Sequence, residues 1–227
     1  MHKEEREKSN TGDGLVLSAS SSVAATLDAI LKPNTMGEYV AYGISQVGSP
    51  PVLGLFALIL IATTLTLSKV WGWFGLYLLL GLFTPLGFLI WQLRHGHITD
   101  LDVQLREQRK KSLLVTILGF ALSWLIMMLG HAPEELTFMA GIGMIQWLII
   151  FMITLRWKIS VHTTSATGVT MLILRIFGLS AVPLVVTIPL IAWSRIKLKH
   201  HTPAQTIAGT ILGVAVFLLA TLITPAY

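Results

Sequence analysis

Long apolar runs, separated by short polar connections, occupy most of the chain after residue 50. The runs cover residues 52–70, 71–93, 112–130, 135–156, 164–179, 180–193 and 204–225. An α-helix rises about 1.5 Å per residue, so about 20 residues cross the ~30 Å hydrocarbon core of a bilayer. Five of the runs have close to that length, and the pattern therefore predicts transmembrane helices.

Two adjacent runs, 164–179 and 180–193, are too short to cross a bilayer. As helices they would measure about 21–24 Å each. Pro183 and Pro189 interrupt the second run further, because proline removes a backbone donor. We expect this pair to form a short helical hairpin whose loop-facing ends lie below the plane of the lipid head groups.

The N-terminal part of the chain has a different pattern. Residues 1–14 are polar, with charges of both signs, and are predicted to form a disordered tail. Residues 15–50 are moderately apolar and are expected to lie along the membrane interface as short amphipathic helices. Residues 51–227 form the predicted transmembrane domain. The fold prediction is an all-α, polytopic bundle of about six to seven membrane helices with an N-terminal interfacial segment.

Composition supports the membrane class. The 227 residues are 54% hydrophobic and 12% charged, and their mean hydropathy is +0.74, values typical of polytopic membrane proteins. The net charge of +5 is carried by residues that flank the apolar runs, which favours anionic lipid head groups over nucleic acid as partners. The chain contains no cysteine, which excludes disulfides and thiolate metal sites.

The three polar connections, 94–111, 156–163 and 194–203, are separated by even numbers of helical segments when the hairpin is counted as two. An even number returns the chain to the same side, so we expect all three on one membrane face. Outside the candidate site they carry Arg94, Lys111, Arg156, Lys197 and Lys199. The positive-inside rule makes this face cytoplasmic, and the expected location is the plasma membrane of a prokaryote.

The third connection combines cations and imidazoles between two apolar runs. Ser194 and Arg195 begin it, His200 and His201 follow, and Gln205 stands four positions after His201. An arginine can hold a phosphate through two parallel hydrogen bonds, and a histidine can attack phosphorus. Charges beside hydrocarbon cost free energy, so their presence indicates a function. The pattern predicts a site for a lipid phosphate.

The other two connections add further candidates: Ser160, His162 and Lys158 in the second, and Asp102, Arg109 and Lys110 in the first. With these residues, the three connections resemble a divergent form of the three motifs of the type 2 phosphatidic acid phosphatase superfamily. The family's third motif is Ser-Arg, five residues, His, three residues, Asp. Here Ser194-Arg195 and His201 fit that spacing, and Gln205 stands in place of Asp.

The other two motifs are less complete. The family's second motif is Pro-Ser-Gly-His, and Ile159-Ser160-Val161-His162 keeps the Ser and the His. The first motif is Lys, six residues, Arg-Pro. Asp102 and Arg109-Lys110 have that spacing and keep the Arg. The resemblance covers about residues 45–225, and its third motif is the most specific.

The resemblance implies an integral-membrane lipid phosphatase that hydrolyses a phosphomonoester or diphosphate of a lipid or prenyl alcohol without a metal or other cofactor. His201 would be the nucleophile that forms a phospho-histidine. His162 would protonate the leaving alcohol and then activate water. Gln205 would accept a hydrogen bond from the His201 ring without supplying the negative charge of the family's Asp.

Phosphate binding is assigned by the same resemblance. Arg109 and Arg195 would clamp the phosphate oxygens and stabilise charge in the transition state. The remaining assigned residues are Ser160 and Ser194 as neutral groups, Lys110 and Lys158 as replacements for the missing Lys, and Asp102, which could instead orient an arginine.

Other interpretations stay open. His200 is an alternative to His201, and Arg109 lies in a basic run that could simply anchor a helix at the interface. The Asp102 and Gln205 departures favour a catalytically inactive relative that binds anionic lipid. A transporter is a weaker hypothesis, because Arg175 is almost alone among charges inside the apolar runs. We expect Arg175 to face a partner or to extend to the interface.

Overall fold

The computed structural model describes residues 33–63 and 70–223, and every regular element within them is helical. The elements are α2 (Met36–Val47), α3 (Pro50–Ala62), α4 (Val70–Tyr77), a π-helix (Leu78–Phe83), α5 (Thr84–Arg94), a 3-10 turn (Arg106–Gln108), α6 (Arg109–Leu129), α7 (Glu134–Thr154), α8 (Val161–Phe177), a 3-10 segment (Gly178–Val186), α9 (Thr187–Lys197) and α10 (Pro203–Ile223). The all-α prediction is confirmed. The predicted tail 1–14 and the first part of the predicted interfacial segment, 15–32, lie outside the described residues.

The chain divides into two compact units, residues 1–39 and 40–227. In the described part of the first unit, Thr35 and Glu38 form a capping box. The Glu38 carboxylate accepts hydrogen bonds from the backbone N–H groups of Asn34 and Thr35, and the Glu38 N–H donates to the Thr35 hydroxyl. This exchange fixes the start of α2.

Five helical stretches of the described chain are long and apolar enough to cross a membrane: Val70–Arg94, Arg106–Leu129, Glu134–Thr154, Val161–Lys197 and Pro203–Leu222. The short helices α2 and α3 pass the same test only as a pair, bent by 49°, and add a sixth. The protein is therefore a multi-pass helical membrane protein, as predicted. The stretch Val161–Lys197 contains both arms of the predicted hairpin.

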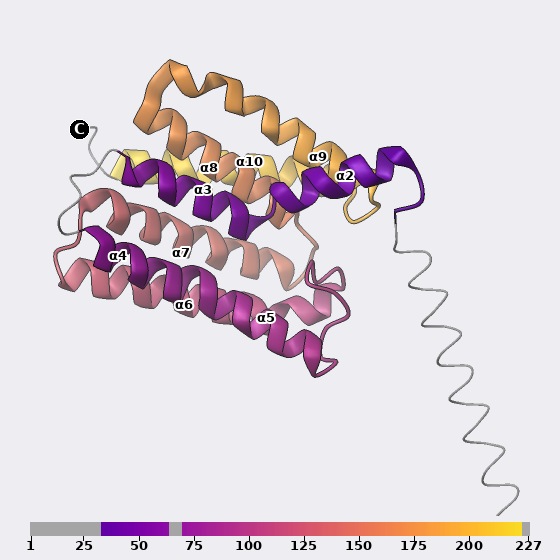
Figure 1. The fold of residues 1–227 in the computed structure, drawn as a ribbon, viewed down its shortest axis with the longest axis horizontal. Coiled ribbons are helices and arrows are strands. Elements are labelled where there is room, and N and C mark those ends of the chain that lie inside the picture. The colour runs from indigo at the N-terminus through magenta and orange to yellow at the C-terminus, as the bar shows by residue number, and fades with distance from the viewer. Residues whose placement is uncertain (1–32, 64–69, 224–227) are drawn as a thin grey trace, which may run out of the picture. The chain divides into compact units, whose positions relative to one another are not determined.

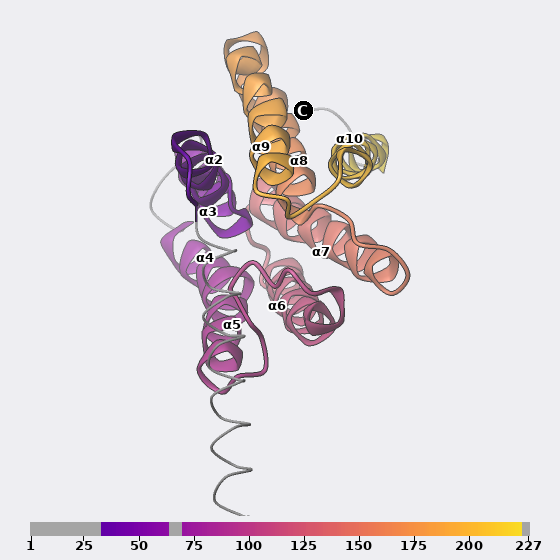
Figure 2. The same cartoon turned by 90° about the vertical axis from the view of Figure 1, so that its right-hand side faces the viewer.

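The hairpin forms as expected. The first arm, α8, ends at Phe177, and Gly178 adopts a φ of 61°, a left-handed conformation that glycine reaches without steric cost. The chain then turns through Gly178–Val186 and returns along α8 as α9 (Figure 1). Figure 2 shows the same two arms from the end of the bundle, with α10 beside α8.

Close packing of α8 on α10 positions the two halves of the candidate site. Gly209 and Gly213 of α10 face α8, and a Cβ atom at Gly209 would lie 2.7 Å from the Ser160 carbonyl oxygen. Small residues at a four-residue spacing allow such an approach between membrane helices. The hydroxyls of Thr164 and Thr167 donate to the carbonyls of Ser160 and Thr163 in their own helix. These polar side chains are therefore satisfied without water.

The main hydrophobic core lies between α3, α4, α6 and α7, with its largest buried side chains including Leu58, Phe74, Met127 and Leu136. Arg175, the charged residue of the short arm, lies with its guanidinium carbon 5.3 Å from the centre of the Phe138 ring. A cation over an aromatic face is stabilised by the quadrupole of the ring. The guanidinium of Arg175 thus faces a neighbouring helix, which is one of the two outcomes expected from the sequence.

Candidate functional site

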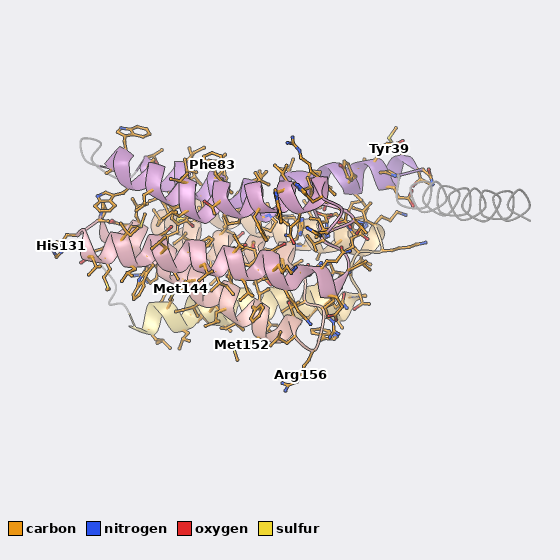
Figure 3. The ribbon with its side chains drawn as sticks, turned by 90° about the horizontal axis from the view of Figure 1, so that it is seen from below. Tyr39, Phe83, His131, Met144, Met152 and Arg156 are labelled. Carbon is orange, nitrogen blue, oxygen red and sulfur yellow. The ribbon has the colours of Figure 1, made fainter. Side chains whose placement is uncertain are left out.

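The three polar connections meet at one end of the helix bundle (Figure 1). The Lys158 ammonium donates to the His200 carbonyl at 2.8 Å, the Ser160 N–H donates to the Gln205 carbonyl, and a guanidinium N–H of Arg109 donates to the Ile159 carbonyl. The opposite end carries His131, and Figure 3 places it far from Arg156 of the second connection. The expected convergence of the three connections is therefore present.

His201 is held in one tautomer at the start of α10. Its Nδ1 atom lies 3.0 Å from Oε1 of Gln205, and the same oxygen accepts from the backbone N–H of Thr202 at 3.1 Å. A backbone N–H can only donate, so the amide oxygen must face both groups, and Nδ1 of His201 must carry the proton. This leaves Nε2 with a free lone pair.

The electrostatic surroundings keep this imidazole neutral. Burial, reinforced by the charges of Arg109, Arg195 and Lys158, lowers the pKa of His201 to about 2, and the hydrogen bond to Gln205 opposes that shift only in part. His201 is 5% exposed. A neutral histidine with a defined tautomer is the state that a nucleophile requires.

Asp102 occupies the centre of the cluster. Its carboxylate lies 2.8 Å from Nη1 of Arg195, 3.4 Å from Nδ1 of His200 and 3.8 Å from Nε2 of His162. Burial alone would raise the pKa of this carboxyl, but His200, Arg195 and His162 together hold it below its ordinary value. Asp102 is therefore ionised at neutral pH.

Arg195 is fully buried behind this carboxylate. Besides Asp102, its Nη1 atom donates to the Ser45 hydroxyl at 2.6 Å and lies 3.5 Å from Nε2 of His162. Its Nε atom has no hydrogen-bond partner within the described residues. Arg195 thus contacts an internal anion where the resemblance implies a phosphate.

Arg109 is the second buried guanidinium, and backbone carbonyls orient it. Its Nε donates to the Val103 carbonyl at 2.7 Å, and Nη1 donates to the Ile159 carbonyl at 3.2 Å. Val103 has a φ of 45°, which is rare for a β-branched residue. This strained residue directly follows Asp102, and Lys199, with a φ of 57°, directly precedes His200. Strain of this kind persists only where the surrounding structure imposes it, and it concentrates at functional sites.

Lys158 is half-buried beside the cluster, and its ammonium donates to the His200 carbonyl. Burial lowers the pKa of Lys158 to about 8, and the nearby charges of Arg109 and Arg195 add to this shift. This lysine therefore titrates close to physiological pH.

The remaining predicted residues have other contacts. Lys110 forms an exposed ion pair with Glu107 at 2.8 Å, so its ammonium is engaged outside the cluster. The Ser194 hydroxyl donates to the Ile191 carbonyl of its own helix. Ser160 is the N-cap of α8, and its hydroxyl oxygen accepts from the Thr163 N–H. These two serines shape the helix ends that carry Arg195 and His162.

A cavity of about 390 Å³ extends from the polar cluster into the apolar part of the bundle. Its charged end is formed by Asp102, Arg109, His162 and His201. Deeper in the bundle its lining includes Tyr77, Met139 and Phe217. Arg195 does not line it. The cavity therefore joins a cluster of ionisable groups to a mainly apolar interior.

Sequence reasoning missed two partners in this cluster and ranked a third below its neighbour. Ser45 belongs to a segment expected at the membrane interface, and Gln104, whose amide lies 3.1 Å from Nε2 of His200, has no motif signal. The motif spacing identifies His200 only as an alternative to His201. Its ring contacts Asp102, and it does not line the cavity.

Comparisons with known proteins give no relatives: no family model, no curated protein and no solved structure matches this chain. Within residues 33–63 and 70–223, no group of three or more His, Asp or Glu side chains is clustered as metal ligands would be.

Proposed function

We propose that this protein is an integral-membrane lipid phosphatase of the phosphatidic acid phosphatase type. It would hydrolyse a phosphomonoester or diphosphate of a lipid or prenyl alcohol through a phospho-histidine intermediate. The observation that carries the proposal is His201. Its Nδ1–H is directed to Gln205, its Nε2 lone pair is free, and it lines the charged end of a mainly apolar cavity.

The first chemical step would be attack by Nε2 of His201 on phosphorus. The new N–P bond forms as the bond between phosphorus and the lipid oxygen breaks, and protonated His162 gives its proton to the departing oxygen. In the second step, neutral His162 takes a proton from water, and the resulting hydroxide attacks phosphorus. The N–P bond breaks, inorganic phosphate leaves, and both histidines return to their starting states.

Asp102 supports the role of His162 in this scheme. The general acid must carry a proton, yet burial and the neighbouring Arg195 charge both disfavour a charged imidazole. The Asp102 carboxylate, 3.8 Å from Nε2, offsets part of this cost. The family pattern pairs a carboxylate with the nucleophilic histidine, whereas in this chain the carboxylate pairs with the proton donor.

Charge and shape support an anionic lipid as the ligand. The charges of three cations, Arg109, Arg195 and Lys158, act on His201. In the described part of the chain, the carboxylates near these cations are Asp102 and Asp100, so the cluster has an excess of positive charge. The cavity volume of about 390 Å³ lies within the range of about 300–1,000 Å³ typical of small-molecule sites. Its mainly apolar interior suits a hydrocarbon chain attached to the phosphate.

The proposed location is the plasma membrane of a prokaryote, with the site on the cytoplasmic face. The basic residues that flank the helices at this end support that orientation. A single cysteine at His97, which is exposed in the first connection, tests it. In intact cells the cysteine should react with an impermeant maleimide only after the inner face is made accessible. Labelling of untreated cells would show that the site lies on the outer face instead.

The decisive test is phosphate release by the purified protein in detergent with EDTA present, using phosphatidic acid and farnesyl diphosphate separately. His201→Ala should abolish release and leave expression and insertion unchanged. When phosphatidic acid carries a labelled phosphate, the wild type and His162→Ala should become labelled through an acid-labile bond to phosphate. His201→Ala, which lacks the nucleophile, should stay unlabelled. His97→Ala, which removes an exposed histidine of the first connection, is the matched control and should behave as wild type.

A non-catalytic lipid-binding protein is the second candidate, and one observation favours it. The internal carboxylate of Asp102 already occupies the cation of Arg195, and Gln205 brings no charge to His201. This candidate predicts affinity for lipid phosphate without release or labelled intermediate, and the same affinity in His162→Ala. The labelling experiment therefore separates the two candidates.

A further inference from the structure

Gln146 is a polar residue in the interior of α7, a helix that spans the membrane. Its side chain is 8% exposed and lines the cavity. It makes no hydrogen bond with any other residue of the described chain. The amide faces the cavity and is not enclosed by protein atoms, and an amide beside an apolar space is stabilised by a hydrogen-bond partner within that space.

Gln92, another buried glutamine, has a hydrogen-bond partner within the protein. Gln92 of α5 is 2% exposed, and its amide donates to the Ser112 hydroxyl at 2.7 Å. A hydrogen bond within the protein thus removes the cost of burying Gln92. Gln146 lacks such a bond, so its amide is available to a molecule in the cavity.

The neighbouring helix makes room for this amide. Gly168 of α8 lies against it, and a Cβ atom there would come within 2.7 Å of Oε1 of Gln146. Any other residue would push the amide out of place. Gly168 follows His162 by six positions and Ser165 by three, so the amide lies ~9 Å deeper along α8 than His162. Gly168, Ser165 and His162 all line the cavity.

We propose that Gln146 is a specificity-determining residue, whose amide N–H donates to an acyl ester carbonyl of the lipid substrate. This inference rests on the proposed function, because it takes the phosphate end of the lipid to lie at His201. A glycerol backbone places an ester carbonyl a few bonds from the phosphate, at the start of the hydrocarbon chain. A prenyl phosphate has no polar atom beyond its phosphate and would leave the amide unpaired.

The consequence is a preference for acylated glycerol phosphates over prenyl phosphates. The same site should distinguish an ester-linked from an ether-linked lipid of equal chain length, since the ether lacks the carbonyl. Loss of one buried hydrogen bond of this kind should change kcat/KM by about tenfold, or about 1.4 kcal/mol.

The experiment compares three lipids: diacyl phosphatidic acid, its dialkyl ether analogue and farnesyl phosphate. We expect the wild type to prefer the ester to the ether by about tenfold in kcat/KM. Gln146→Met, which keeps the length of the side chain but removes its donor, should bring that ratio close to one and raise kcat/KM for farnesyl phosphate, because no unpaired amide then faces the prenyl chain. Ser123→Ala removes a buried, unpaired hydroxyl that does not line the cavity, and should leave the ratio unchanged.

Binding gives a readout that does not need turnover. The rise in melting temperature caused by each lipid should follow the same order, ester above ether, in the wild type only. An ester-to-ether ratio of one in the wild type, or a ratio that persists in Gln146→Met, would overturn the role of Gln146. Failure to release phosphate from any lipid would overturn the proposed function. The ester and ether lipids would then be compared by their effects on melting temperature, which test the hydrogen bond of Gln146 without turnover.

Discussion

The Nη1 atom of Arg195 lies 2.8 Å from Oδ2 of Asp102, although the two residues are 93 positions apart in the chain. Arg195 is fully buried, and only 21% of the Asp102 side chain is exposed. The pair joins α9 to the connection between α5 and α6, and the bond from Arg195 to Ser45 adds α2. This contact is therefore a structural link as well as part of the candidate site.

Removing the carboxylate should destabilise the protein. Asp102→Ala leaves the Arg195 guanidinium buried without its anion, and breaking such pairs typically costs about 3–5 kcal/mol. Asp102→Asn keeps an oxygen acceptor and should cost less. Melting temperatures in detergent measure both effects. Glu107→Ala, which breaks an exposed ion pair with Lys110, is the control and should change little. Equal melting temperatures for Asp102→Ala and Glu107→Ala would contradict the assignment.

Acid should weaken the same contact. The pKa of Asp102 is lower in the folded protein than its ordinary value, so ionised Asp102 stabilises the fold at neutral pH. That contribution should be lost as the pH falls below about 4, where the unfolded chain binds the proton more readily. A melting temperature measured against pH should fall more steeply below pH 4 for the wild type than for Asp102→Asn.

The bond between His201 and Gln205 should control the rate of the chemical step. Gln205→Leu removes the acceptor of the Nδ1 proton and should lower kcat about 10- to 100-fold, by analogy with the loss of hydrogen-bond partners of metal-bound histidines. Gln205→Glu supplies a charged acceptor, which stabilises the positive charge that develops on the ring. It should raise kcat above the wild type. An unchanged kcat in both variants would show that His201 does not act as the nucleophile.

Lys158 should set the alkaline limit of activity. Its pKa is about 8, so it is charged below pH 8 and loses its charge above it. For the wild type, kcat/KM for the lipid phosphate should fall as the pH rises through 8, because a nearby cation is lost. Lys158→Arg should remove this decline, since arginine stays charged. Lys110→Arg alters an exposed lysine and should keep the wild-type profile.

The sequence was sufficient for features that depend on local spacing. Run lengths and prolines predicted the hairpin of α8 and α9, because a helix of fixed rise cannot cross the bilayer in 16 residues. His201 and Gln205 lie four positions apart at the start of one helix, so their contact follows from helix geometry. The same geometry accounts for the contact of Lys110 with Glu107 outside the cluster. Lys110 follows Arg109 directly on α6, and adjacent residues of a helix face different directions.

Contacts between residues far apart in the chain could not be predicted from the sequence. Asp102 contacts Arg195 and directly precedes Val103, which adopts a φ of 45° that its residue type disfavours. Ser45 was assigned to an interfacial segment, and nothing in its neighbourhood indicates a buried arginine partner. Gln146 sits in an apolar run where periodicity assigns it no role. Each of these contacts depends on how distant helices pack, which hydrophobic patterning constrains only loosely.

Helix packing beside the cavity offers a last prediction, at Gly119 of α6. A Cβ atom there would collide with the backbone carbonyl of Leu80 in the π-helix that precedes α5. A backbone carbonyl cannot move aside by changing its rotamer as a side chain can. Gly119→Ala should therefore displace the π-helix and lower the free energy of unfolding by about 1–3 kcal/mol. Leu82 and Leu86, which line the cavity, lie just beyond Leu80. The displacement should therefore alter the site for the hydrocarbon chain and leave the histidines in place.

Two measurements test this separation. Gly119→Ala should lower the melting temperature and raise KM for a long-chain lipid phosphate several-fold, with little effect on the hydrolysis of a short, soluble phosphate ester. Gly87→Ala is the matched control, because a Cβ atom there meets open space, and it should stabilise the helix by about 0.5–1 kcal/mol. Equal losses for long and short substrates in Gly119→Ala would mean that the cavity does not hold the hydrocarbon chain.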